Sequence, residues 1–243
     1  CKFCASGVGG LERNLTAGEI IEQALLISAE AQATGVRLSN IVFMGSGEPL
    51  VNYDNVMRAV RTINAADGLG IGARKITIST VGLPRQIRRL ADEGLQVNLA
   101  LSLHAPTDVL RQELIPWAEK ISLAELVSAC SHFFKQTGRE ITLEYILLRG
   151  VNDLPVHAQA LAKFARQFRC NVNLLRYNPI EGLGYDRPSS AATHSFVEYL
   201  RSAGINAHVR TSRGLDIDAA CGQLRRREMQ AGSEDVSLNV IAS

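Results

Sequence analysis

Short apolar runs alternate with helical patterns along most of this chain, and this alternation restricts the possible fold more than any other feature. The runs that end abruptly at glycine or polar residues are typical of buried parallel strands. The expected strands are 41–44, 75–80, 97–104, 141–148, 172–177 and 207–211. The expected helices between them are 54–66, 84–93, 123–136, 156–168 and 191–203. Five strand–helix units in succession predict a parallel sheet with helices packed outside it.

A further helix is expected ahead of these units. Thr16 and Glu19 have the spacing of a capping box, which predicts a helix from Ala17 to about Ala33. With one more strand expected just upstream of Cys1, the α/β pattern gives six units, a partial or opened form of the eightfold barrel. We expect one barrel domain over residues 1–230, truncated at its N-terminus, and a polar tail over residues 231–243.

The composition is ordinary for a soluble enzyme, with 46% apolar and 21% charged residues among 243. No apolar run is long enough to cross a bilayer and the start does not resemble a signal peptide, so no membrane association is expected. Five scattered cysteines fit a reducing cytoplasm better than a disulfide framework. Because the chain opens on cysteine instead of methionine, it is interpreted as a fragment.

The net charge of +2 does not by itself indicate nucleic-acid binding. Two arginine clusters, 85–89 and 225–227, have the charge to contact phosphates. For each cluster taken singly, a solvated helix face is the favoured interpretation.

Polar residues recur at the C-terminal ends of the expected strands, where ligands gather in this architecture. They are Gly47 and Glu48 after the first strand, Ser79 in the second, Ser102 and His104 in the third, and Asn178 after the fifth. A sheet that only builds a core has no need of polar groups along one edge. The sequence therefore predicts a binding site at this edge.

Cys1 and Cys4 form a Cys-x-x-Cys pair at the start of the chain. Such a pair alone is compatible with a redox-active dithiol, half of a zinc site or two ligands of an iron–sulfur cluster. The surrounding motifs favour the cluster.

Seven motifs in a fixed order resemble those of one enzyme family. They are the Cys1–Cys4 pair, Arg13-Asn14-Leu15, GSGEPL at 45–50, Ser79-Thr80, SLHAP at 102–106, Tyr177-Asn178-Pro179, and RGxDIxAACGQL at 213–224. Together they resemble the radical S-adenosylmethionine (SAM) enzymes that methylate C2 of an adenine in 23S ribosomal RNA and in transfer RNA. The resemblance extends from residue 1 to about residue 230. It implies a partial (βα)6 barrel whose first strand and N-terminal RNA-recognition domain are missing from this chain.

The resemblance implies two cofactors, a [4Fe–4S] cluster and SAM. The family's cluster ligands follow Cys-x3-Cys-x2-Cys, so Cys1 and Cys4 match the second and third, and the first ligand is missing here. Glu48, held by Gly47, is implied to accept hydrogen bonds from the methionine ammonium group. The residues implied to line the ribose, carboxylate and adenine of SAM are Ser79, Ser102, Leu103, His104 and Asn178.

Cys221 matches the family's catalytic cysteine, and it lies among small residues that allow close approach of a ligand. The family's ping-pong chemistry implies that it takes a methyl group from one SAM molecule. A 5′-deoxyadenosyl radical from a second SAM then removes a hydrogen from that methyl, and the resulting methylene radical adds to C2 of adenine. A second cysteine, expected upstream of this chain, resolves the adduct.

The implied partners are 23S ribosomal RNA, transfer RNA or both, with flavodoxin or ferredoxin as electron donor, and the enzyme is expected to be a cytoplasmic monomer. Three alternatives remain. A related enzyme methylates C8 of the same ribosomal adenosine and confers antibiotic resistance. A non-catalytic RNA-binding relative is disfavoured by the retained Cys1, Cys4, Glu48 and Cys221. A metabolic barrel enzyme acting on a phosphorylated substrate is disfavoured, because this sequence has no glycine-rich phosphate loop near its last strands.

Overall fold

Six parallel strands form one curved sheet in which each strand pairs with its neighbours in the chain. The structure is a computed structural model that describes residues 1–5, 10–45, 47–180 and 182–210. The strands are β1 Ile41–Phe43, β2 Ile76–Thr80, β3 Asn98–Ser102, β4 Ile141–Leu147, β5 Cys170–Arg176 and β6 Ala207–Arg210. The predicted parallel α/β sheet is confirmed. All six strands lie within residues 41–210, so the strand expected upstream of Cys1 is additional to them.

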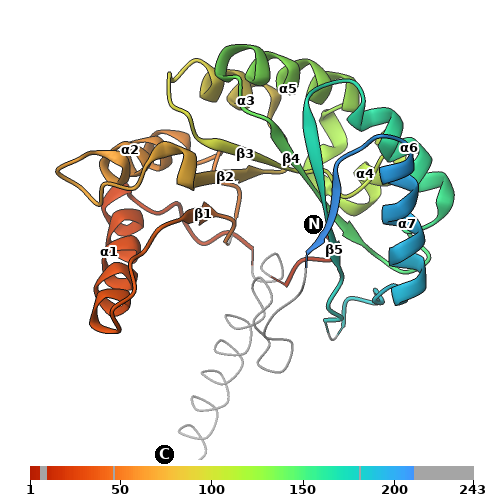
Figure 1. Cartoon of the computed structure of the whole chain (residues 1–243), viewed down its shortest axis with the longest axis horizontal. Helices are drawn as coiled ribbons and strands as arrows, with labels where there is room; N and C mark the ends of the chain where they lie inside the picture. Colours follow the sequence, from red (N-terminus) through yellow and green to blue (C-terminus); the bar gives the residue numbers. More distant parts are fainter. Residues whose placement is uncertain (6–9, 46, 181, 211–243) are drawn as a thin grey trace, which may run out of the picture.

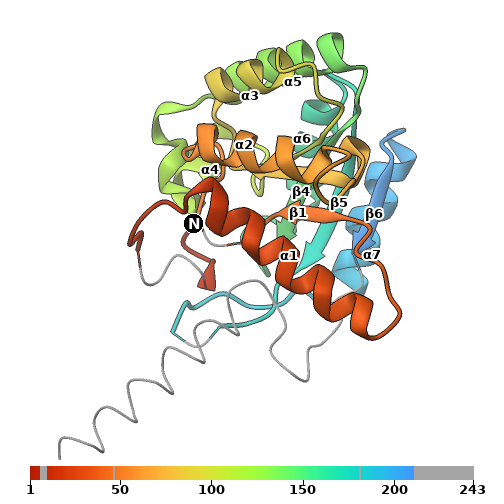
Figure 2. The same ribbon diagram turned by 90° about the vertical axis from the view of Figure 1, so that its left-hand side faces the viewer.

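The helices lie along the outer side of the curved sheet and leave its inner side open (Figure 1). They are α1 Ala17–Ala33, α2 Tyr53–Asn64, α3 Pro84–Ala91, α5 Leu123–Thr137, α6 Pro155–Ala165 and α7 Ser190–Ser202. Figure 2, turned by 90°, shows α1 on the side that faces the viewer, running diagonally below α2. The segment between β3 and α5 adds a short helix, α4 Asp108–Leu114, and a 3-10 turn, Pro116–Lys120, which the sequence analysis did not predict.

Local chemistry fixes several helix ends. The predicted capping box at α1 is confirmed, because the Thr16 hydroxyl accepts from the backbone of Glu19 and the Glu19 carboxylate accepts from the backbone of Thr16. Ser122 caps α5 in the same way. Helix α5 ends at Gly138, whose φ of 66° is a left-handed conformation that glycine adopts without strain.

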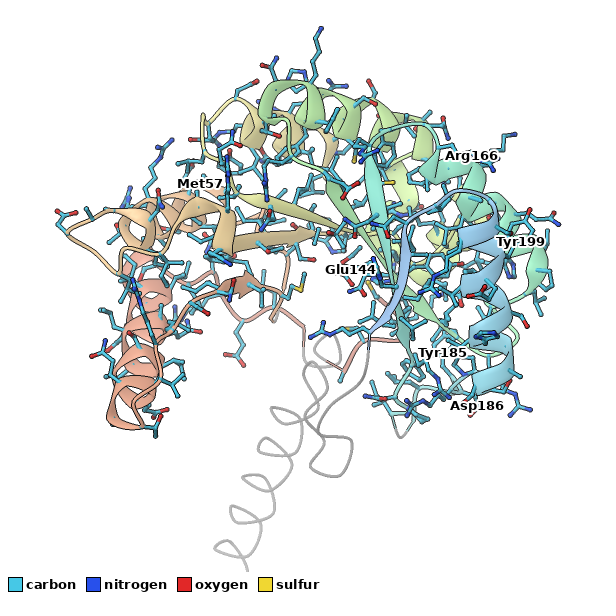
Figure 3. The ribbon with its side chains drawn as sticks, viewed as in Figure 1. Met57, Glu144, Arg166, Tyr185, Asp186 and Tyr199 are labelled. Carbon is cyan, nitrogen blue, oxygen red and sulfur yellow. The ribbon has the colours of Figure 1, made fainter. Side chains whose placement is uncertain are left out.

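The two faces of the sheet differ in chemistry. In β2, Ile76 and Ile78 are fully buried against the outer helices, whereas the alternating Thr77 and Ser79 point to the inner face and are half-buried. The outer face therefore carries the apolar core. The inner face is polar, and its buried carboxyl, Glu144, is labelled in Figure 3.

The inner face carries a hollow of about 600 Å³, lined by residues from β1 to β6. Its lining side chains largely bind one another. Asn98 receives a hydrogen bond from Arg139, and Asn171 donates to Glu140 at 3.3 Å. None of the predicted site residues that the structure describes lines this hollow, so it is not their site.

Candidate functional site

Strands β2 and β3 bring two of the predicted site residues together at the edge of the sheet. Ser79 and Ser102 both face inward and are half-buried, with their hydroxyl oxygens 3.3 Å apart. Hydroxyls both donate and accept, so this pair suits the ring oxygens and hydroxyls of a bound sugar.

Glu48 is held in the loop after β1 by two backbone groups. Its Oε1 accepts from the Leu50 amide at 3.0 Å and its Oε2 accepts from the Val81 amide at 2.8 Å. Gly47 precedes it with a φ of 87°, a conformation that favours glycine. Burial raises the pKa of Glu48, and the two backbone hydrogen bonds act in the opposite direction. The Thr80 hydroxyl is a third hydrogen-bond partner and also lowers the pKa. The carboxylate is thus fixed in place, and three donors leave about one of its four acceptor sites for a ligand.

Arg111 on α4 binds the other side of the same peptide segment. Its Nη2 donates to the carbonyl of Val81, whose amide binds Glu48. The side chain is 1% exposed, and its Nε and Nη1 have no hydrogen-bond partner among the described residues. Burial lowers the pKa of Arg111 to about 10. The sequence analysis missed this residue, because an arginine in a short unpredicted helix carries no local signal of burial.

His104 leaves the end of β3 in an unusual conformation. Its φ of 57° is positive, which is uncommon outside glycine. Its Nδ1 accepts a hydrogen bond from the Ile146 amide at 3.1 Å, so this nitrogen is the unprotonated one. Burial lowers the pKa of His104 to about 3, with a smaller contribution from the positive charge of Arg111. The neighbouring Leu103 is fully buried, and its amide donates to the Glu144 carbonyl at 3.0 Å.

Asn152, another residue that the sequence analysis missed, fixes the backbone of His104. This side chain is fully buried, and its Nδ2 donates to the carbonyls of His104 at 2.8 Å and Ile146 at 2.7 Å. Its Oδ1 accepts from the Leu148 amide at 2.7 Å. Three hydrogen bonds from one amide therefore join the ends of β3 and β4. The neighbouring Asn152 and Asp153 are typical of a turn in sequence, but they do not indicate these hydrogen-bond partners.

Cys1 and Cys4 lie on one turn, because the Cys4 amide donates to the Cys1 carbonyl at 3.2 Å. Both thiols are free and half-buried. The intervening Phe3 is buried and meets the ring of His104 edge-on, with centroids 5.1 Å apart and planes at 82°. No group of three or more histidine, cysteine or carboxylate side chains in the described part of the chain is placed to hold a metal ion. The described residues thus bring two thiols, and not three, to this edge.

Asn178 follows β5 at the same edge of the sheet. Its Oδ1 is buried and has no hydrogen-bond partner among the described residues. The preceding Tyr177 packs in one apolar cluster with Phe3 and Leu114, and Cys1 contacts this cluster. The end of β5 and the cysteine turn are therefore close together.

Of the three remaining cysteines, the structure describes Cys130 and Cys170 but not Cys221. Burial raises the pKa of Cys130 and of Cys170 to about 12. Thiols with so high a pKa stay protonated at neutral pH and are unreactive. Cys221 lies outside the described residues, as does the arginine cluster 225–227.

A parallel sheet with a polar site at its C-terminal edge and a cysteine pair over that edge defines a class of α/β enzyme. The model of the Radical SAM superfamily matches residues 1–161, and the chain belongs to that superfamily.

The relatives narrow the assignment. A protein named "Probable dual-specificity RNA methyltransferase RlmN" from Thermosynechococcus vestitus is 49% identical over 95% of this chain and 67% of its own length. One of the same name from Symbiobacterium thermophilum is 52% identical over 93% of this chain and 61% of its own length. Within the superfamily the chain is a member of this RlmN family. It spans about two-thirds of the length of these relatives.

A solved structure supports the same assignment. The crystal structure of a radical SAM methyltransferase from Sphaerobacter thermophilus is 48% identical with a TM-score of 0.89, over 92% of this chain and 65% of that one. The structure of Streptococcus suis SuiB bound to S-adenosylmethionine has a TM-score of 0.61 at 18% identity and shares the fold. In the described residues no helix is long and apolar enough to cross a membrane.

Proposed function

We propose that this chain is the core of a radical SAM methyltransferase that methylates C2 of an adenosine in 23S ribosomal RNA, in transfer RNA or in both. The contact between Phe3 and His104 carries this proposal, because it joins the cysteine turn to the edge that holds Ser79, Ser102 and Glu48. The printed names of the relatives support RNA as the substrate.

The residues present fit the two cofactors. Two half-buried thiols on one turn suit two corners of a [4Fe–4S] cluster, and the third thiolate would come from upstream of Cys1. The buried Oδ1 of Asn178 is an acceptor that a donor group of SAM would satisfy. When bound, the cluster and SAM supply the radical chemistry that C2 of adenine requires, since this carbon is neither nucleophilic nor acidic.

The protein's own residues would orient the cofactor and carry the methyl group. Glu48 would accept from the methionine ammonium through its remaining acceptor site, and the hydroxyls of Ser79 and Ser102 would orient the ribose. The Cys221 thiolate would take the methyl group by forming a sulfur–carbon bond as the sulfonium carbon–sulfur bond breaks. The target adenosine would be extruded from its stack to reach this edge, and a loop adenosine costs least to extrude. Flavodoxin or ferredoxin would supply electrons.

The complete gene product, expressed without oxygen, tests the proposal. We expect visible absorption from the cluster and a methyl mass increment on the tryptic peptide that carries Cys221. Cys221→Ala should keep the cluster absorption and lose RNA methylation, and unchanged methylation would refute the role of this cysteine. Comparison of the modified nucleoside with C2-methyl and C8-methyl standards separates the two methylation sites. A protein that binds neither cluster nor SAM would instead be a non-catalytic relative.

A further inference from the structure

Two arginines lie close together at the C-terminal edge of the sheet and have no counter-ion among the described residues. Arg176 ends β5, and Arg187 lies in the loop that leads from β5 to α7. Arg176 donates to the carbonyl of Pro188, the residue that follows Arg187, so its guanidinium group lies beside the Arg187 segment. Burial lowers the pKa of Arg187, and the positive charge of Arg176 lowers it further. Among the described residues there are six ion pairs, and none involves either arginine or the nearby Asp186.

The hydrogen bonds of the two guanidinium groups are also incomplete. Arg176 donates once, from Nη2 to the Pro188 carbonyl at 3.1 Å, and Arg187 makes no hydrogen bond to the described residues. The Nε atoms of both are buried without a partner there. Like charges held together with unused donors are unfavourable unless an anion joins them. Guanidinium groups bind phosphate oxygens with particular strength.

The position of the pair suits a nucleic acid strand. Arg176 immediately precedes Tyr177 and Asn178, so the pair adjoins the proposed SAM site. Tyr185, two residues before Arg187, is half-buried and meets Tyr177 edge-on with centroids 6.2 Å apart. Figure 3 labels Tyr185 beside the end of β5. Arginines beside an aromatic ring are typical of surfaces that bind single-stranded RNA.

Two of the three arginines of α3, which the sequence analysis also considered for phosphate binding, are engaged otherwise. Arg88 donates to Ser128 at 2.7 Å, and Arg89 pairs with Asp54 at 2.6 Å. They lie on the outer side of the sheet, away from the site edge (Figure 1).

We propose that Arg176 and Arg187 form a phosphate-binding subsite for the RNA strand that carries the target adenosine. This inference rests on the proposed function, since it takes RNA as the substrate. The pair positions the backbone next to the extruded base and does not read sequence.

RNA binding by the complete protein tests the subsite. Fluorescence anisotropy would follow a labelled RNA stem-loop, with adenosines in its loop, at a series of KCl concentrations. The double variant Arg176→Gln/Arg187→Gln should bind at least about tenfold more weakly at low salt. The slope of log K against log [KCl] should become shallower by about 1.4, because each phosphate contact on a single strand contributes about 0.7.

Two further variants serve as controls. Arg166→Gln should leave affinity and slope unchanged, because Arg166 likewise donates one Nη2 to a backbone carbonyl but lies at the opposite end of the sheet (Figure 3). The double variant Arg176→Lys/Arg187→Lys keeps both charges and should keep the wild-type slope. If circular dichroism shows that the glutamine variant is unfolded, the lysine variant tests the subsite in its place. A shallower salt slope in the folded lysine variant would overturn the subsite.

The possible failures are distinguishable. Wild-type protein that binds no RNA would overturn the proposed function. Wild-type binding together with unchanged affinity and slope in the glutamine variant would overturn the subsite and leave the proposed function standing.

Discussion

Replacing Asn152 by alanine should destabilise the protein more than most single substitutions. The change removes three hydrogen bonds of 2.7–2.8 Å and leaves the Leu148 amide and the carbonyls of His104 and Ile146 without these partners in a fully buried position. A buried polar group left unpaired costs about 1–3 kcal/mol, and a carbonyl with a second lone pair costs less than an amide. We expect a loss of about 3–5 kcal/mol in the free energy of unfolding, out of the roughly 5–15 kcal/mol typical of a domain.

Urea denaturation of the complete protein, followed by circular dichroism, measures this loss. Asn171→Ala is the matched control, because Asn171 is half-buried and its side chain makes a single hydrogen bond to Glu140 at 3.3 Å. The control should lose less than about 1 kcal/mol. Because Asn152 fixes the His104 backbone, its variant should also bind SAM more weakly. A loss below about 1 kcal/mol for Asn152→Ala would refute the view that this amide joins β3 to β4.

Three other predictions concern the same edge of the sheet. Gly82 has a φ of 96° and a Cβ there would lie 2.6 Å from a Leu126 methyl, so Gly82→Ala should cost about 2–4 kcal/mol in urea denaturation. Gly94→Ala, at a φ of 70° with open space, should cost only about 1 kcal/mol, and equal losses would contradict the packing argument. The raised pKa of Glu48 means that its contribution to stability is present below its ordinary value near 4.5 and is lost as the pH rises through the folded pKa. Glu48→Gln should remove this decrease of the free energy of unfolding with rising pH. An unchanged pH dependence in the variant would contradict the raised pKa of Glu48. The pKa of His104 is lowered to about 3, so this residue has the opposite effect on the pH dependence of stability. The free energy of unfolding should fall as the pH drops from about 6.5 toward 3. In His104→Gln this pH-dependent fall should be missing.

The repeating elements could be predicted from sequence because their signals are local. Alternation of apolar runs and helical patterns predicted the six strands, and the Thr16–Glu19 spacing predicted the start of α1. The expected third strand, 97–104, was too long, since β3 ends at Ser102. After Ser102 the chain leaves the hydrogen-bonded strand, and His104 has a positive φ. Helix α4, with seven residues, is too short to show a helical period.

The supports of the site could not be predicted, because their partners are distant in the chain. Asn152 binds a carbonyl 48 residues earlier, and Arg111 binds one 30 residues earlier. Neither residue type nor spacing indicates such a partner, and arginine is rarely buried. The roles assigned to Glu48 and Asn178 stay predictions, which the cofactor-binding experiments above address.

The order of the sheet has a consequence for how the protein assembles. Within the described part of the chain, every strand pairs only with strands adjacent in the sequence, so none of these strands waits for a partner that is synthesised much later. A chain emerging from the ribosome can therefore add one strand and one helix at a time onto the part already formed. The nascent protein should gain protease resistance in steps that follow the lengths of these units, with the edge carrying Asn178 completed only after β5 has been synthesised.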